Sequence, residues 1–176
     1  MSQQTDLHHG QHVRRLVLAA MFAAMGVLLS FPPLAIPVVG TKLYPFQHTI
    51  NAVAGILLGP WYAAGAALVT AALRNMIGWG TPFAFPGSPF GALVVGYAYR
   101  ALRNDAAALF EPLGTGPIGA TLAALIVAPM MGKHLTLWTL QVLFLSSSIP
   151  GAILGYLLIR ALRRVAVVDA FATQTR

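Results

Sequence analysis

Six polar side chains interrupt the long apolar runs between residues 45 and 91, and their types suit the binding of a small polar molecule. They are Gln47, His48, Asn51, Arg74, Asn75 and Ser88. His48 and Asn51 stand three positions apart and would share one face of a helix. A polar or charged group among apolar side chains needs a partner, because hydrocarbon offers it none. These residues are therefore candidates for contacting a ligand.

Aromatic residues accompany this polar group. Trp79 and Phe85 flank a turn rich in Gly and Pro, where their rings could hold a planar molecule. Trp138 and Gln141 lie near the start of the last apolar run, at the same predicted end of the chain's helices. The predicted ligand-binding residues are His48, Asn51, Arg74, Asn75, Trp79, Phe85, Ser88, Trp138 and Gln141.

Several of these residues also have a purely structural interpretation. Arg74 could extend its charged end to lipid headgroups, and Asn51 could hydrogen-bond to a neighbouring helix. The aromatic residues could form the interfacial belt that is common in membrane proteins. The serines at 146–148 are assigned to helix packing rather than to binding. The residues alone leave these alternatives open.

The composition places the polar residues in a membrane. Hydrophobic residues make up 57% of the 176 residues and charged residues 9%, whereas soluble domains carry roughly 25% charged residues. Six apolar runs predict an all-α bundle of transmembrane helices, at 16–31, 46–58, 61–77, 87–100, 117–131 and 137–162. The transmembrane domain is predicted at 14–164, between a disordered cytoplasmic tail at 1–13 and a second polar cytoplasmic tail at 165–176.

Two connecting segments stand out. Residues 32–45 contain four prolines but remain apolar, which predicts a non-helical segment that lies over a site at the membrane surface as a lid. Residues 101–116 contain Arg103, Asp105 and Glu111, which predicts the main polar loop.

The cations divide unequally between the two predicted sides of the bundle. Eight of the eleven Lys and Arg residues fall on the side of both termini, which the positive-inside rule assigns to the cytoplasm. All four acids fall on that side as well: Asp6, Asp105, Glu111 and Asp169. The outer half then holds Lys42, Arg74 and Lys133 without a carboxylate. Because the net charge of +7 comes from residues that flank the spans, no nucleic-acid partner is predicted.

The sequence gives no support to an enzyme. It contains no Walker A glycine loop, no HExxH motif, no GxSxG motif and no Cys. With no acid predicted inside a span, ion-pump chemistry is also disfavoured. No catalytic residue, metal or cofactor is predicted.

Small residues recur four positions apart in the first apolar run, at Ala19, Ala20, Ala23 and Ala24. Such spacing lets another helix approach closely in lipid. Because Ala is common in transmembrane helices, the spacing alone leaves docking and ordinary packing equally open.

The run GPWYAAGAALVTAALRNMIGWGTPFAFPGSPFGALVVGY, preceded by PFQHTINAVAGILLG, resembles the ThiW family. Members of this family are substrate-binding (S) components of energy-coupling factor (ECF) vitamin transporters. The resemblance implies six helices, an extracytoplasmic ligand pocket in a cell-membrane protein, and docking through small residues of the first helix onto a transmembrane coupling subunit. Two ATPase subunits would power that partner. The implied ligand is hydroxyethylthiazole, the thiazole precursor of thiamin.

Three other functions remain open from the sequence. The chain could be an S component for thiamin or for its pyrimidine precursor, a stand-alone small-molecule channel or facilitator, or a membrane scaffold that carries no ligand. A ligand pocket would argue against the scaffold, and ion conductance without partners would favour the channel.

Overall fold

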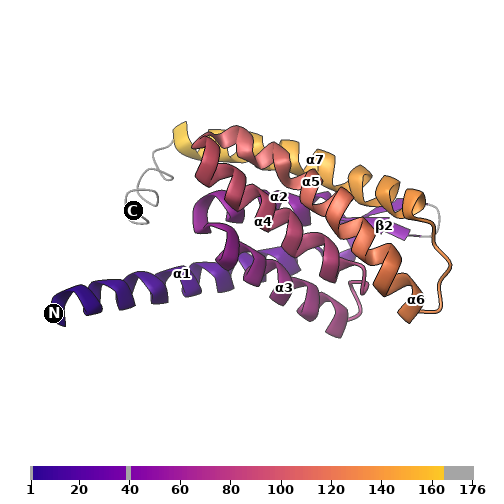
Figure 1. Cartoon of the computed structure of the whole chain (residues 1–176), viewed down its shortest axis with the longest axis horizontal. Helices are drawn as coiled ribbons and strands as arrows, with labels where there is room; N and C mark the ends of the chain where they lie inside the picture. Colours follow the sequence, from indigo (N-terminus) through magenta and orange to yellow (C-terminus); the bar gives the residue numbers. More distant parts are fainter. Residues whose placement is uncertain (1, 39–40, 165–176) are drawn as a thin grey trace.

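The computed structural model describes residues 2–38 and 41–164, and over these residues the chain forms six longer helical segments, one three-residue 3-10 helix and one small β-hairpin (Figure 1). In order, the first elements are α1 (Ser2–Leu28), η1 (Pro32–Leu34), β1 (Ile36–Val38), β2 (Thr41–Leu43), α2 (Pro45–Leu58), α3 (Pro60–Met76) and α4 (Ala84–Leu102). A continuous helical segment, Asp105–Met130, then precedes α7 (Leu137–Arg164). That segment consists of η2 (Asp105–Phe110), α5 (Glu111–Leu113), η3 (Gly114–Ala120), η4 (Ala123–Val127) and α6 (Ala128–Met130), of which η3 and η4 have π-helical geometry.

Helix α2 lies in the middle of the bundle. It packs against α1, α3, α4 and α7, and twelve of its 14 residues are buried. At about 1.5 Å per residue, 14 residues rise only about 21 Å, which is less than the hydrocarbon thickness of about 30 Å. Three segments are long and apolar enough to cross a membrane by length and composition: His9–Leu28, Asp105–Met130 and Leu137–Arg164. The shorter α2 therefore depends on its neighbours for burial.

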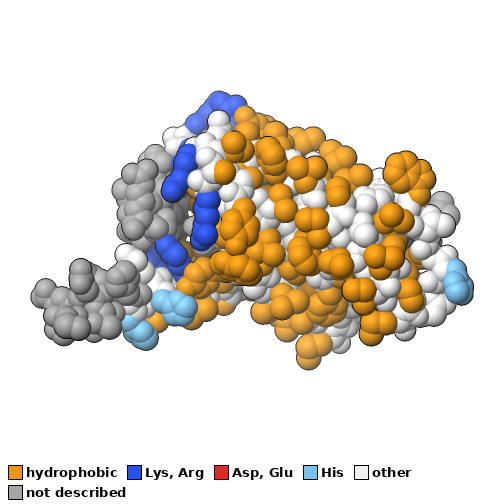
Figure 2. Space-filling view, in the orientation of Figure 1, with side chains coloured by type: hydrophobic (Ala, Val, Ile, Leu, Met, Phe, Trp, Pro, Cys, Tyr) orange, Lys and Arg blue, Asp and Glu red, His pale blue; other side chains and the backbone are white. Residues whose placement is uncertain are grey.

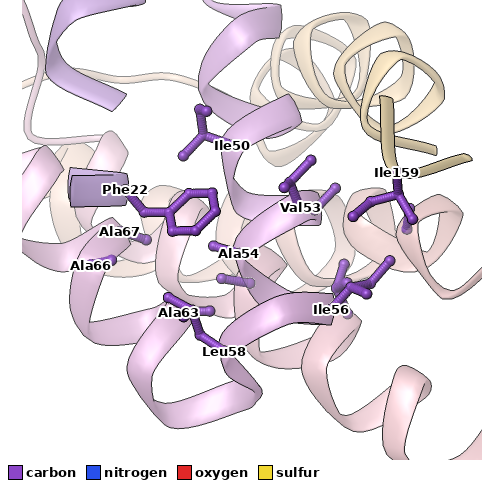
Figure 3. Close-up of a cluster of buried hydrophobic side chains, with 14 of the residues drawn as sticks. Phe22, Ile50, Val53, Ala54, Ile56, Leu58, Ala63, Ala66, Ala67 and Ile159 are labelled. Carbon is purple, nitrogen blue, oxygen red and sulfur yellow. The ribbon is translucent and has the colours of Figure 1, made fainter. Parts of the chain in front are cut away.

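A core of apolar side chains joins α1, α2, α3, α4 and α7, and part of it is shown in Figure 3. Phe22 from α1, Val53 from α2 and Ile159 from α7 are buried in it. Helix α3 contributes Ala63 and Ala67, whose small side chains let the neighbouring helices pack closely. The apolar runs of the sequence thus form both the helices and the contacts between them.

The prediction of a polar loop over residues 101–116 is wrong. Arg103, with φ 50°, ends α4 in the left-handed region, and the Asn104 side chain accepts a hydrogen bond from the Ala106 amide at 2.9 Å. The next helical segment therefore begins at Asp105 rather than at Pro117. Pro112 does not interrupt it, because it lies in the first turn of α5, where an amide proton is not required.

The N-terminal residues also differ from the expectation. Residues 2–13, predicted as a disordered tail, form the first part of α1, which extends away from the bundle (Figure 1). No proline interrupts the sequence between Ser2 and the apolar part of this helix. The predicted tail at 165–176 lies outside the described residues.

The connections place two groups of loops at opposite ends of the bundle (Figure 1). One end carries the turn at Gly59, which has φ 81° and joins α2 directly to α3, and the ends of α4 and α7. The other end carries the β-hairpin, in which Pro37 pairs with Lys42, and the loops that follow α3 and α6. Within the proline-rich segment 32–45, the described residues 35–38 and 41–44 are non-helical, as the composition predicts, whereas Pro32–Leu34 form the short 3-10 helix η1.

Charged and apolar side chains are also distributed unevenly along the bundle. Figure 2 shows hydrophobic side chains over the length of the bundle and Lys and Arg gathered at one end. The basic residues where α4 and α7 end are Arg100, Arg103, Arg160, Arg163 and Arg164. Large apolar side chains such as Trp61, Leu125 and Leu157 are exposed on the sides. An apolar belt of this kind suits contact with lipid.

Candidate functional site

A cavity of about 580 Å³ opens at the end of the bundle that carries the β-hairpin. Its walls come from α2, the end of α3, the loop after α3, the start of α4, η3 and α7, with Pro32 and the residues of β2 on one side. Gly87 makes room for an aromatic wall, because a Cβ there would lie 3.2 Å from the Phe144 ring. The volume is in the range of cavities that enclose small molecules.

Arg74 lies at the base of one wall and is only 3% exposed. Its guanidinium carbon lies 4.1 Å from the centroid of the Tyr44 ring, a cation–π contact. Its Nε atom is buried and has no hydrogen-bond partner within the described part of the chain. Tyr44 is itself fixed, because its hydroxyl donates to the Trp79 carbonyl at 2.8 Å. The cation is therefore positioned against the cavity by an aromatic ring rather than by a carboxylate.

His48 lines another wall and is held from behind by Glu111. Glu111 is fully buried, and its Oε1 atom lies 2.8 Å from His48 Nδ1. Asn51 Nδ2 at 3.3 Å and the Thr115 hydroxyl at 2.8 Å donate to the same oxygen. In the His48 tautomer that carries its proton on Nδ1, this contact is a hydrogen bond donated to Glu111, and Nε2 is the ring nitrogen available to a ligand.

The burial of Glu111 has a local cause in α4. A Cβ at Gly91 would overlap the Glu111 carboxylate and the Thr115 hydroxyl. Gly91 thus lets the helical segment after Asp105 approach α4 closely enough for Glu111 to reach His48. This corrects the expectation that no carboxylate lies inside the bundle, which followed from placing Glu111 in a loop.

A chain of hydrogen bonds continues from this group toward α1. Gln47 donates to Asn51 Oδ1 at 3.3 Å and accepts from the Ser30 hydroxyl at 3.1 Å. Ser30 also donates to the Gly26 carbonyl at 2.6 Å. These polar groups satisfy one another inside the bundle, where an unsatisfied group would cost about 1–3 kcal/mol. The network fixes the side of α2 that faces the cavity.

Four of the nine predicted ligand-binding residues line the cavity: His48, Arg74, Trp79 and Ser88. The other five are not among the described residues that line it: Asn51, Asn75, Phe85, Trp138 and Gln141. Asn51 lies behind His48, and Asn75 donates to the Ala71 and Thr81 carbonyls at 2.8 and 3.1 Å. Trp138 is 77% exposed.

Sequence reasoning missed several residues of the cavity. Tyr44, Phe83, Phe144, Thr115 and Ser147 all line it, and Glu111 supports it from behind. A helical repeat could have identified part of the α7 wall, since Leu140, Leu143, Phe144 and Ser147 recur at the spacing of one helix face. Ser147, which was assigned to packing, also accepts a hydrogen bond from the Tyr44 amide at 2.9 Å.

The four small residues of α1 divide into two pairs. Ala23 is buried against α3, where the Thr70 hydroxyl donates to its carbonyl at 3.2 Å, and Ala19 packs against the same core. Ala20 and Ala24 are exposed, about 100° around the helix from the first pair. This second pair is therefore the more accessible to another protein.

The fold defines the class of protein. A solved structure described as the S-component for biotin from an ECF-type ABC transporter superposes on this chain with a TM-score of 0.65, covering 88% of this chain and 93% of that chain. The sequences are 20% identical, so this similarity shows the fold alone. The bundle therefore has the fold of an S component.

The sequence then defines the family. Residues 16–165 match the family described as thiamine-precursor transporter protein (ThiW), and the chain belongs to this family. No protein with a curated description matches the sequence. Family and fold together identify a multi-pass membrane protein of vitamin or vitamin-precursor uptake, which is a transport role rather than an enzymatic one.

Proposed function

We propose that this chain captures hydroxyethylthiazole outside the cell and delivers it to the cytoplasm together with a transmembrane coupling subunit and two ATPase subunits. The observation that carries the proposal is the cavity of about 580 Å³, which combines aromatic and aliphatic walls with a few fixed polar groups. The family supplies the class of substrate, a thiamin precursor.

The cavity offers a specific way to hold such a molecule. Trp79, Phe83 and Phe144 provide flat apolar surfaces for a thiazole ring. His48 Nε2 accepts a hydrogen bond from the hydroxyl of the ligand, because Glu111 holds the Nδ1 proton on the other side of the ring. Asn51 and Asn75, which bond within the protein, act by fixing His48 and the loop after α3.

The β-hairpin acts as the lid. Pro32, Lys42 and Tyr44 line the cavity, and the hydrogen bonds from Tyr44 to Trp79 and Ser147 hold this segment against α3 and α7. Release of those two hydrogen bonds would let the hairpin move away without disturbing the helices. Such gating by a surface segment is common in binding proteins.

Titration of the purified protein with hydroxyethylthiazole, thiamin and the pyrimidine precursor tests the substrate. We expect the thiazole to bind and the pyrimidine not to bind. Binding of thiamin or the pyrimidine without the thiazole would exclude the proposed substrate, and binding of none of them would exclude the site. In liposomes without partner subunits we expect no ion conductance, and conductance would favour a channel.

The exposed pair of small residues on α1 provides the docking surface for the coupling subunit. Replacing Ala20 and Ala24 by Leu should abolish co-purification with that subunit, because bulky side chains prevent close helix approach. Ligand binding to the isolated protein should stay unchanged. The buried Ala23 is the matched control position: Ala23→Leu should instead destabilise the protein by about 1–3 kcal/mol through overpacking. Co-purification of the Ala20→Leu/Ala24→Leu variant would exclude this surface.

The cation distribution favours both termini in the cytoplasm and the cavity outside. Since the chain contains no Cys, single cysteines report accessibility without background. His134→Cys, in the exposed turn before α7, should react with an impermeant thiol reagent in intact cells. Arg164→Cys, at the exposed end of α7, should react only after the cells are opened. The reverse pattern would place the cavity on the cytoplasmic side.

A further inference from the structure

The cavity is strongly cationic. Lys42, Arg74 and Lys133 all line it, and none of the described residues that line it is Asp or Glu. The three cations come from β2, the end of α3 and the turn after α6, so no single helix end or basic run gathers them. Lys133 lies 5.9 Å from the centroid of the Phe83 ring, which is itself part of the aromatic wall.

Glu111 does not neutralise these charges. Its carboxylate accepts from His48, Asn51 and Thr115, and it is not part of the lining. A single carboxylate contributes at most one negative charge, so the three lining cations exceed it.

Arg74 and the two lysines differ in depth. Arg74 is 3% exposed and its Nε atom has no hydrogen-bond partner among the described residues. Lys42 and Lys133 are exposed at the rim. A neutral alcohol can occupy only one or two donors of such a set, whereas an oxyanion accepts several charge-assisted hydrogen bonds at once. The cations at the rim would also attract an anion toward the cavity.

We propose that the cavity binds a small heteroaromatic substrate that carries an oxyanion, a carboxylate or a phosphate ester, in preference to the neutral alcohol. Arg74 binds the oxyanion from inside the cavity, and Lys42 and Lys133 close around it from the rim. The ring then lies against Trp79 and Phe144, near His48. This inference goes beyond the proposed function, because it replaces the neutral alcohol by an anionic thiazole as the preferred ligand, and it rests on the cavity being the substrate site.

Lipid headgroups offer the same phosphate chemistry as a soluble phosphate ester, and Lys42 and Lys133 at the rim could contact them. The buried position of Arg74 favours the soluble ligand, because a headgroup anchored in the bilayer would have to leave its own plane to reach it. The cavity also has aromatic walls, which a headgroup does not need.

Paired titrations test the proposal. The purified protein is titrated with hydroxyethylthiazole, with its phosphate ester and with the carboxylate formed by oxidising its alcohol. At low salt we expect at least one of the two anions to bind about tenfold more tightly than the alcohol, with the preference shrinking as salt is raised. Equal or tighter binding of the alcohol would overturn this inference and leave the proposed function intact. Failure of all three compounds to bind would overturn both.

The preference must also depend on the named cations. Lys42→Gln/Lys133→Gln changes only exposed side chains, so it should fold, and it should reduce the ratio of anion to alcohol affinity several-fold. Arg74→Gln should reduce the ratio further. Arg164→Gln, which removes an exposed cation at the end of α7, is the matched control and should leave the ratio unchanged. An unchanged ratio in the Lys42→Gln/Lys133→Gln variant, or an equal change in the control, would overturn the assignment.

Binding measured in nanodiscs distinguishes a soluble phosphate ester from lipid headgroups. The ratio of anion affinity to alcohol affinity should be retained when zwitterionic lipid is replaced by a mixture containing phosphatidylglycerol. If the anionic lipid abolishes the preference for the soluble anion, the cations bind lipid headgroups instead, and the inference is overturned.

Discussion

Two arginines at opposite ends of the bundle each lie beside a tyrosine, but their electrostatic surroundings differ. Arg163, near the end of α7, donates from Nε to both Asp105 oxygens at 2.7 and 2.8 Å and from a terminal nitrogen to the Tyr99 hydroxyl at 2.9 Å. Arg74, at the end of α3, lies over the ring of Tyr44 at 4.1 Å. The first arginine has a carboxylate, whereas the second has an aromatic surface and a buried Nε without a partner in the described residues.

This difference separates a cation whose charge is compensated within the protein from one that we propose to bind the substrate. The Arg163–Asp105 pair joins the end of α7 to the start of the preceding helical segment, and its charge is compensated within the protein. The cavity end also contains a carboxylate, Glu111, but this group bonds to His48, Asn51 and Thr115. Glu111 thus orients a histidine, and it does not compensate the charge of Arg74, which we propose to bind the substrate.

The largest effect is expected from the removal of Glu111. In Glu111→Leu, the donors of His48, Asn51 and Thr115 lose their shared acceptor inside the bundle. We expect a loss of roughly 3–5 kcal/mol in the free energy of unfolding, since several buried donors become unsatisfied together. Thermal unfolding in detergent measures the change.

Glu111→Gln is the control for that experiment, because it keeps the shape and one acceptor oxygen. It should be much less destabilising than Glu111→Leu. If the two variants unfold alike, the hydrogen bonds to Oε1 do not stabilise the bundle. If Asp105→Leu lowers the free energy of unfolding by as much as Glu111→Leu, the buried acid beside the cavity does not stabilise the bundle more than the partly exposed acid at the other end.

A second comparison separates the two tryptophans predicted to bind the ligand. Trp79 lines the cavity, and its ring lies 5.2 Å from that of Phe31, whereas Trp138 is outside the lining and 77% exposed. Trp79→Ala should weaken substrate binding by about 0.5–1.5 kcal/mol, the contribution of an aromatic contact beyond its buried area. Trp138→Ala should leave the affinity unchanged. Titration calorimetry distinguishes the two, and equal losses would show that the ligand contacts a different wall.

Much of the fold could be predicted from hydrophobic runs, since apolar segments of helical length specify both the helices and their burial in a membrane. The α2–α3 turn was recognisable from Gly59 and Pro60, and the non-helical hairpin from its prolines. The burial of Glu111 inside the bundle was not predicted. An acid near Pro112 and Gly114 resembles a loop by composition, and only the close contact at Gly91 shows that it is buried against His48.

The candidate site could likewise be predicted only in part from the sequence. Types and spacing identified His48, Arg74, Trp79 and Ser88, which line the cavity. Residue types and spacing could not predict which face of α7 lines the cavity. Leu140 lines it, whereas Gln141, the next residue, does not. Types and spacing also could not show which of Ala19 and Ala20 faces outward, because both belong to a four-residue repeat and only packing against α3 decides.

The smallest effect is expected at the end away from the cavity. Asp105→Asn removes the carboxylate charge from Arg163, but both side chains are partly exposed, at 28% for Arg163 and 16% for Asp105. Such a pair contributes only about 0–1 kcal/mol, and salt reduces this further. We expect a small loss of thermal stability that shrinks at high ionic strength, with no change in ligand affinity. Because Arg163 and Arg74 lie at opposite ends, a measurable loss of affinity in Asp105→Asn would mean that the charge at one end controls the cavity at the other. Unchanged affinity, beside a clear loss in Arg74→Gln, would establish that the two arginines have separate roles.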